Sequence, residues 1–287
     1  MKEKFAFFSI WFVTFGFFCH SQSPDPWLIK AENIDPSTYY GITVANGMIG
    51  IVSSPEPLKV KDVVLAGAYD QYGRGRVSNF LRSFNLLNML LEIDGKRMDA
   101  KATSNFQQQL NMRQAKFTTS FNYEDKAVIS YTYYALRHLP FTVFMDVSVT
   151  AKKPISIIAS SVMEAPDALR DVQNYYNEID RPHVAISLLT SSAKSPTGKL
   201  LMCASNTFLF TEQHGNEPRV IHEMWDNNMH LMKFSKKLSA GETYRYSVAG
   251  SSITSAHHDD PLNEAERLTI YAKLEGRDRL LQFHQKA

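Results

Sequence analysis

A long series of strand-like segments, beginning near Tyr39, constrains the fold of this chain more than any other feature. The segments are rich in Val, Ile, Thr, Tyr and Phe, which favour strands. Many of them alternate apolar with polar residues, and this period of two is typical of a strand with one buried face. The segments span residues 39–45, 88–100, 115–136, 141–163, 183–191, 199–212, 227–238 and 243–253.

Turn-forming residues separate these segments. Asp94-Gly95 is a strong hairpin dipeptide, and the stretch before Pro154 also has the composition of a reversal. Ser239–Glu242 is another tight connection. The spacing predicts about a dozen strands or more, as in a large sandwich. We therefore predict an all-β fold, a large antiparallel β-sandwich over residues 27–256.

Helical periodicity is confined to the last segment, residues 257–287. Asp260 is suited to cap a helix that begins at Pro261, and Gly276 is expected to interrupt it, so that a second helix starts near residue 277. A helix this short is marginal in water, so its apolar face needs a partner. We predict a short helical linker whose partner lies outside the chain. The apolar positions, spaced by three and four, are Leu262, Ala265, Leu268, Tyr271 and Ala272.

The N-terminus has the pattern of a secretory signal peptide. Lys2 and Lys4 precede an apolar run, Phe5–Phe18, and polar residues follow it. The run is shorter than the roughly 20 residues that span a bilayer, so no membrane span is expected. We predict a signal peptide over residues 1–22 and export to the periplasm or the extracellular space. Lipidation at Cys19 is the less favoured alternative, because bulky Phe residues precede it.

Charge and cysteine content exclude several classes of protein. The chain has 31 Lys and Arg against 29 Asp and Glu, a net charge of +2, which argues against a nucleic-acid binder. Only two cysteines occur, and Cys19 is expected to leave with the signal peptide. Cys203 lies in an apolar run and is predicted to be a buried small hydrophobe. Neither a disulfide framework nor a cysteine-rich metal site is expected.

Two stretches carry a family resemblance. The first holds an Asn46-Gly47-x-x-Gly50 turn and, some twenty residues later, Gly67, Tyr69 and Asp70; the second holds the run Leu110–Arg113. In this order they resemble the N-terminal domain of glycoside hydrolase family 65. That family contains the kojibiose, maltose and trehalose phosphorylases and related α-glucoside hydrolases. The sequence "GIVSSPE" departs from an Arg-Gly that the family often has, which loosens any assignment to a phosphorylase subtype.

The resemblance implies a galactose-mutarotase-like super-sandwich, helical linkers and then an (α/α)6 barrel that carries the catalytic glutamate. "HQKA" at His284–Ala287 resembles the four residues before the barrel's first tryptophan, so the barrel is expected to be missing from this chain. The resemblance therefore implies a non-catalytic domain of an exported inverting α-glucoside hydrolase or phosphorylase, contributing carbohydrate binding and domain packing. Its expected partners are that barrel and an α-linked glucose disaccharide or oligosaccharide. Export favours water over phosphate as the nucleophile.

The chain's own carboxyl groups do not form an obvious catalytic pair. Glycoside hydrolysis needs two acids, one of them with a raised pKa. The acids that lie close in sequence are in contexts typical of solvated loops. We therefore predict no catalytic residue and no turnover by the chain alone. The pairs considered are Glu164 with Asp167, Asp171 with Glu178 and Asp180, Glu223 with Asp226, and Asp259 with Asp260.

The segment His257-His258-Asp259-Asp260 has two interpretations: a set of metal ligands, or a linker that ends in a helix cap. Adjacent residues of an extended chain point to opposite sides, so the two histidines do not easily share one ion. A zinc site also needs ligands at defined spacing and a second shell of partners. We predict neither a metal nor another cofactor.

The loop Tyr69–Val77 is the best candidate for a sugar contact. Tyr69, Asp70, Tyr72 and Arg74 combine aromatic rings with groups that bond hydroxyls, next to two glycines. The alternative is a solvated connection that packs on the barrel. Two other functions remain open: a stand-alone secreted carbohydrate-binding module, and a dimerisation module that forms a homodimer.

Trp225 in "EMWDNN" is a candidate for a second aromatic platform that contacts sugar. A core tryptophan near a strand end is the favoured interpretation of that residue.

Overall fold

Three antiparallel sheets account for most of the chain in the computed structural model, which describes residues 25–32, 34–73 and 77–287. The predicted signal peptide, residues 1–22, lies outside the described residues. The largest sheet has nine strands in the order β1 (Leu28–Ala31), β8 (Thr103–Asn111), β9 (Lys116–Tyr123), β10 (Ala127–Ala135), β11 (Thr142–Ala151), β18 (Thr243–Thr254), β15 (Leu201–Phe210), β14 (Val184–Lys194) and β13 (Arg170–Arg181).

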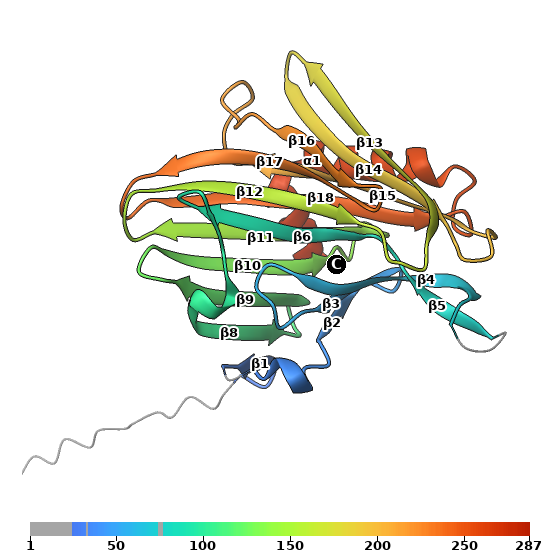
Figure 1. Ribbon diagram of the computed structural model, residues 1–287, viewed down its shortest axis with the longest axis horizontal. Coiled ribbons are helices and arrows are strands. Elements are labelled where there is room, and N and C mark those ends of the chain that lie inside the picture. Colours follow the sequence, from blue (N-terminus) through green and yellow to red (C-terminus); the bar gives the residue numbers. More distant parts are fainter. Residues whose placement is uncertain (1–24, 33, 74–76) are drawn as a thin grey trace, which may run out of the picture.

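Two smaller sheets lie against one face of the nine-stranded sheet (Figure 1). One has the order β16 (Ile221–Asp226), β17 (Met229–Leu238), β12 (Ile155–Glu164), β6 (Asn85–Ile93) and β7 (Lys96–Arg97). The other has the order β2 (Thr43–Ala45), β3 (Ile49–Ser53), β4 (Val60–Gln71) and β5 (Ser78–Arg82). Two short 3-10 turns, η1 (Pro36–Thr38) and η2 (Ala100–Ala102), complete the connections.

A core of interlocking aromatic and aliphatic side chains joins the sheets. Phe234 on β17 meets Phe208 on β15 and Tyr246 on β18 edge-on, with ring centroids 5.0 and 4.9 Å apart. All three are at most 2% exposed. Edge-to-face pairs are the arrangement that ring quadrupoles favour. The predicted all-β fold, a large antiparallel sandwich followed by a C-terminal helix, is confirmed.

The predicted hairpin at Asp94-Gly95 is confirmed. Both residues have positive φ, 54° and 76°, as a type I′ turn requires, and they join β6 to β7. The Asp94 carboxylate also accepts the Ser156 amide at 3.0 Å, which ties the turn to β12. Turn chemistry and sheet packing therefore agree here.

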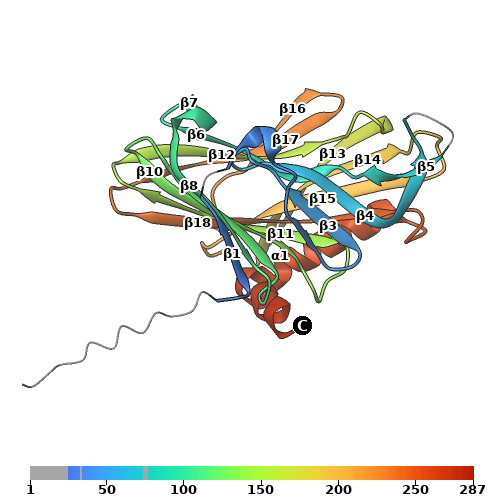
Figure 2. The same ribbon diagram turned by 90° about the horizontal axis from the view of Figure 1, so that it is seen from below.

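The C-terminal helix α1 (Pro261–Lys286) lies on the other face of the nine-stranded sheet (Figure 2). Asp260 caps it by accepting the Asn263 amide at 3.2 Å. Gly276 has φ 77° and ψ 161°, outside helical values, so it divides α1 into two helical parts as predicted.

The apolar face of α1 is covered by the chain's own sheet. Ala265, Ala272 and Leu280 are fully buried and pack mainly against side chains of β15 and β18, among them Leu209 and Ala249. The expectation that this face needs a partner outside the chain is therefore wrong. The reason is that β15 and β18 are buried on both faces, so their outward side chains form an apolar seat for the helix.

Cys203 belongs to this seat. It is fully buried next to Ile253 and Ala265, and burial raises the pKa of its thiol to about 12. The prediction of a buried small hydrophobe is confirmed. Within the described part of the chain, no helix has the length and apolar character needed to cross a bilayer.

Candidate functional site

Three of the predicted sugar-facing residues, Tyr69, Asp70 and Tyr72, lie on a hairpin that projects from the sandwich (Figures 1 and 2). We call the outer parts of β4 and β5, residues 67–73 and 77–81, the arm. Tyr69 and Phe80 are directly opposite each other across the arm and are 58% and 61% exposed. Directly opposite residues share a face of the sheet. The arm therefore presents two large aromatic side chains to solvent, and Tyr72, near its tip, is also exposed.

Asp70 belongs to the opposite face of the arm and is buried. Its carboxylate accepts the Thr197 amide at 2.9 Å and the Thr197 hydroxyl at 2.6 Å. Burial alone would raise the pKa of this carboxyl group. Hydrogen bonds from Ser195, Thr197 and the Gln71 amide outweigh burial and hold the pKa well below its ordinary range. Asp70 thus fastens the arm to the connection between β14 and β15.

The four predicted site residues are consequently separated. Tyr69 and Tyr72 are exposed to solvent, whereas Asp70 is buried and hydrogen-bonded to Thr197. Arg74 lies outside the described residues. Sequence reasoning missed Phe80, although the two-residue alternation of β5 and the pairing of β4 with β5 could have indicated it.

The base of the arm is tied to the segment that leads into α1. The His257 ring lies between the Ala66 carbonyl, 2.6 Å from Nε2, and the Thr254 hydroxyl, 2.8 Å from Nδ1. Gly67 has φ +77°, and a Cβ at this position would lie 3.3 Å from His257 Nε2. Backbone conformation and the close histidine together explain a glycine at this position.

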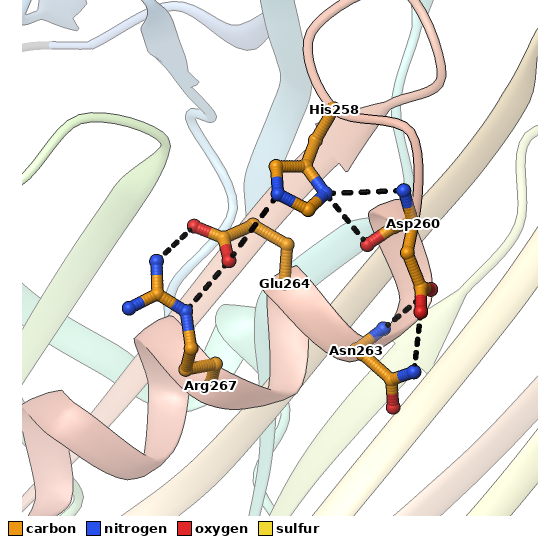
Figure 3. A network of polar contacts seen from close by, with 5 residues as sticks. All are labelled: His258, Asp260, Asn263, Glu264 and Arg267. Atoms are coloured by element: carbon orange, nitrogen blue, oxygen red, sulfur yellow. Dashed lines mark hydrogen bonds and ion pairs between the residues drawn. The ribbon is translucent and has the colours of Figure 1, made fainter.

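Two further residues of the His-His-Asp-Asp segment, His258 and Asp260, precede α1 and contact its first turn (Figure 3). The Asp260 amide donates to His258 Nδ1 at 3.1 Å. Glu264 holds Arg267 through two bonds of 2.7 and 2.6 Å. Hydrogen bonds from Asn263 and Arg267 lower the pKa of Asp260 and Glu264, respectively. Among the described residues, no group of three or more His, Cys, Asp and Glu side chains is arranged to hold a metal ion.

Acidic side chains elsewhere are stabilised in their charged form. A general acid needs the opposite, a pKa raised by burial. Hydrogen bonds and ion pairs lower the pKa of the carboxyl groups of Asp35, Asp94, Asp125 and Glu223. These four carboxyl groups therefore do not have the raised pKa that a glycosidase requires of its general acid.

A contact between fully buried His230 and half-buried His222 was not predicted from the sequence. His230 is fully buried, with Nε2 2.9 Å from the Ser191 hydroxyl and Nδ1 3.3 Å from His222 Nε2. Ser191 donates to the Asn174 side-chain oxygen at 2.7 Å, so its own oxygen accepts from His230. Burial lowers the pKa of His230 to about 4, with a smaller effect from His222. The pair links β16 and β17 to β13 and β14.

This serine–histidine contact is structural. Ser191 is 1% exposed and His230 is fully buried, so a substrate does not reach either group. The only sequence signal is the pair of histidines on two segments that form a hairpin, β16 and β17.

Trp225 lies on an edge strand rather than in the core. β16 is the edge of the five-stranded sheet, and the pairing shifts between Met224 and Asp226. Trp225 is 48% exposed, next to Met224 and near Ile221, which are also about half exposed. The favoured interpretation of a core tryptophan is therefore wrong, because the strand has no neighbour on that side.

The fold and these side chains together define a β-sandwich domain with a docked C-terminal helix and without an acid pair of catalytic character in its described part. A family model described as "Glycosyl hydrolase family 65, N-terminal domain" matches residues 41–287. The chain belongs to this family, and the resemblance inferred from the ordered series of short motifs is confirmed.

Similar proteins agree with this assignment. The chain is 68% identical over 271 residues to a kojibiose hydrolase of Mucilaginibacter mallensis, covering 94% of this chain and 40% of the relative. It is 49% identical over 287 residues to a kojibiose hydrolase of Flavobacterium johnsoniae, covering 99% and 42%. The chain thus spans about two fifths of the length of these curated relatives.

A solved structure has the same fold. A putative kojibiose phosphorylase from the human microbiome superposes with a TM-score of 0.67 at 13% identity, covering 92% of this chain and 38% of that chain. At this identity the likeness concerns the fold alone.

Proposed function

We propose that this chain is the non-catalytic N-terminal domain of an exported, inverting hydrolase that acts on α-linked glucose disaccharides, with kojibiose as the leading substrate. The observation that carries the proposal is the family match over residues 41–287 together with 68% identity to a kojibiose hydrolase. In the proposed reaction, water attacks the anomeric carbon while a general acid protonates the leaving oxygen, which yields two glucose molecules. Both catalytic groups would belong to an (α/α)6 barrel of the complete enzyme.

Water is favoured over phosphate as the nucleophile for two reasons. The matched curated relatives are hydrolases, and export would take the enzyme away from the phosphate of the cytoplasm. Export itself is supported by Lys2, Lys4 and the apolar run Phe5–Phe18. Expression in a Gram-negative host should yield a periplasmic protein whose mature N-terminus lies near residue 23. Recovery of the uncleaved chain in the cytoplasm would contradict export.

The domain's role in the enzyme would be to position the catalytic part and to contribute to sugar contacts. Packing of both parts of α1 on the nine-stranded sheet supports the first role, because a docked helix holds a fixed direction relative to the sandwich. The exposed aromatic side chains of the arm support the second, since aromatic rings provide apolar surface for the faces of sugar rings.

A chimera tests this function. The region of the M. mallensis kojibiose hydrolase that matches this chain would be replaced by this chain, and glucose release from kojibiose would be measured with and without phosphate. We expect activity within about tenfold of the parent, a barrier change of ~1.4 kcal/mol or less, and no dependence on phosphate. A folded chimera that leaves kojibiose intact, or that acts only with phosphate, would refute the proposal.

The arm can be tested in the same chimera. Tyr69→Ala and Phe80→Ala together should raise the KM for kojibiose about three- to tenfold, because they remove exposed aromatic surface and leave the core intact. Val128→Ala, at an exposed position of β10, is the matched control. An unchanged KM in the arm variant would exclude it from the substrate site.

The exposed apolar side chains of the edge strand β16 favour a second role, formation of a homodimer. Ile221, Met224 and Trp225 place apolar side chains at an edge strand, where unpaired backbone groups also invite association. Sedimentation of the chain should then give a dimer that Trp225→Ser converts to a monomer. A monomer at all concentrations would exclude this role.

A further inference from the structure

A groove of about 360 Å³ lies between the β13–β14 hairpin, the end of β15, the segment 211–220 and helix α1. None of its lining residues belongs to the arm. One wall carries Glu178 and Asp180 of β13. Segment 211–220 contributes a second wall with Arg219 and with Glu217, which is ion-paired with Lys273 of α1, and β15 contributes Phe210.

The wall formed by segment 211–220 is fixed from two directions. Near its start, Glu212 binds Lys236 at 2.6 Å and accepts the Tyr244 hydroxyl at 3.2 Å. Near its end, Glu217 binds Lys273 of α1 at 2.8 Å, and these two side chains are only 17% and 8% exposed. The Lys273 ammonium also lies 5.6 Å from the centroid of the Phe210 ring. The groove is therefore formed before any ligand arrives, which lowers the cost of binding.

Charge argues against an ionic ligand. Glu178 and Asp180 would repel an anionic ligand, and Arg219 would repel a cationic one. The Glu217–Lys273 pair is already neutralised internally. Carboxylates accept hydrogen bonds and guanidinium groups donate them, so the two walls together suit a neutral ligand with many hydroxyl groups, each of which does both. The volume lies in the range of small-molecule sites.

The exposure of the groove's acidic side chains favours a binding role over a catalytic one. Glu178 and Asp180 are both exposed and lie two residues apart on the same strand, so they stand on one wall and do not flank a bond. The Tyr176 hydroxyl donates to Glu178 Oε1 at 2.7 Å, which orients this carboxylate. Glu217, on segment 211–220, is ion-paired with Lys273 at 2.8 Å. None of the three has the desolvated, unpaired setting of a general acid.

We propose that this groove is a non-catalytic binding site for a glucose disaccharide, with Glu178, Asp180 and Arg219 as the hydrogen-bonding residues. The choice of a glucose disaccharide rests on the proposed function, whereas the groove and its mixed polarity do not. Such a site would hold substrate on the sandwich, away from the arm.

Calorimetric titration of the full chain with kojibiose, and with sorbitol as a polyol control, tests this site. We expect saturable binding of kojibiose with a dissociation constant of about 1 mM and no binding of sorbitol. Glu178→Gln with Asp180→Asn should weaken binding about tenfold, and Arg219→Gln, on the other wall, should do the same. Asp171→Asn, an exposed acid of the same strand outside the groove, should leave binding unchanged. Thermal unfolding of each variant verifies that it is folded.

The outcomes separate this site from the proposed function. Absence of kojibiose binding up to about 20 mM, more than tenfold above the expected constant, would overturn the groove proposal. So would binding that the groove variants leave intact and that Tyr69→Ala abolishes. If the chimera hydrolyses kojibiose while the chain binds none, only the groove proposal fails. If groove variants lose binding while the chimera is inactive, the groove stands and the proposed function fails.

Discussion

At the scale of single residues, Asp70 is the clearest case of a polar side chain that works inside the fold. Asp70→Asn would replace one acceptor oxygen with an amide that faces the Thr197 donors. We expect it to lower the free energy of unfolding at pH 7 by about 1–3 kcal/mol, measured by urea denaturation. Asp167→Asn, on the surface, is the control. Equal stability of Asp70→Asn and the parent would contradict this role.

The Asp70 contribution also has a definite pH dependence. The pKa of Asp70 is lowered in the folded state, so the unfolded chain takes up the proton first as the pH falls. The stabilisation is complete above the ordinary aspartate pKa of about 4 and is lost below it. Asp70→Asn should abolish this part of the acid sensitivity.

His230 gives the domain a second pH dependence, at higher pH. Its folded pKa of about 4 lies below the ordinary histidine value of 6.5, so the unfolded state binds the proton more readily. Stability should be complete above pH 6.5 and should fall by about 2 kcal/mol by pH 5. His230→Gln, which keeps a hydrogen-bonding side chain, should flatten the curve between these values. Equal slopes in parent and variant would show that other histidines are responsible.

Some of these residues were within reach of sequence reasoning and others were not. The exposed rings of Tyr69 and Tyr72 follow from residue type alone. The burial of Asp70 depends on Thr197, which is more than 120 positions away, and such a pairing has no local signal. Gly250 is similar: a Cβ there would lie 2.8 Å from the Ser205 carbonyl of β15, and only the pairing of β15 with β18 reveals the constraint.

At the scale of elements, hydrophobic periodicity predicts the strands and the glycine at position 276 predicts the break in the helix, because both signals are local. It does not predict where α1 packs. The run "LMCASNTFLF" of β15 does not alternate apolar with polar residues, which is typical of a strand buried on both faces. That signal indicates a cover on the outer face of β15, which α1 provides.

Arg277 anchors the second part of α1 just after the glycine break. It binds Asp146 of β11 through two bonds of 2.8 and 2.7 Å, and Asp146 also accepts the Ser247 hydroxyl. Arg277→Ala should lower the free energy of unfolding by about 1–3 kcal/mol. It should also speed hydrogen exchange in residues 277–286 more than in residues 261–275.

Arg279→Ala is the matched control for this anchor. Arg279 pairs with Glu275 and lies over the Phe283 ring, both of the same helix, and is 62% exposed, so its loss should change stability by about 0.5 kcal/mol or less. Similar effects of the two substitutions would mean that burial alone, and not the Arg277–Asp146 pair, holds the second part of α1 in place.

At the scale of the whole molecule, the sandwich and α1 form one scaffold around a shared sheet. The outward faces of β15 and β18 seat the helix, and their inward faces complete the core. The arm and the groove then lie on separate parts of this scaffold. Family membership was within reach of the sequence through an ordered series of short motifs, whereas the groove was not, since its walls come from three segments that are far apart in the sequence.

The central claim is that this domain supports glycoside hydrolysis without performing it. Glucose release from kojibiose by the purified 287-residue chain, with and without phosphate, tests it most directly, with the complete M. mallensis enzyme as positive control. We expect no release above the uncatalysed background in either buffer, because the two proposed catalytic groups belong to the barrel of the complete enzyme. Sustained turnover by the chain alone would contradict this account.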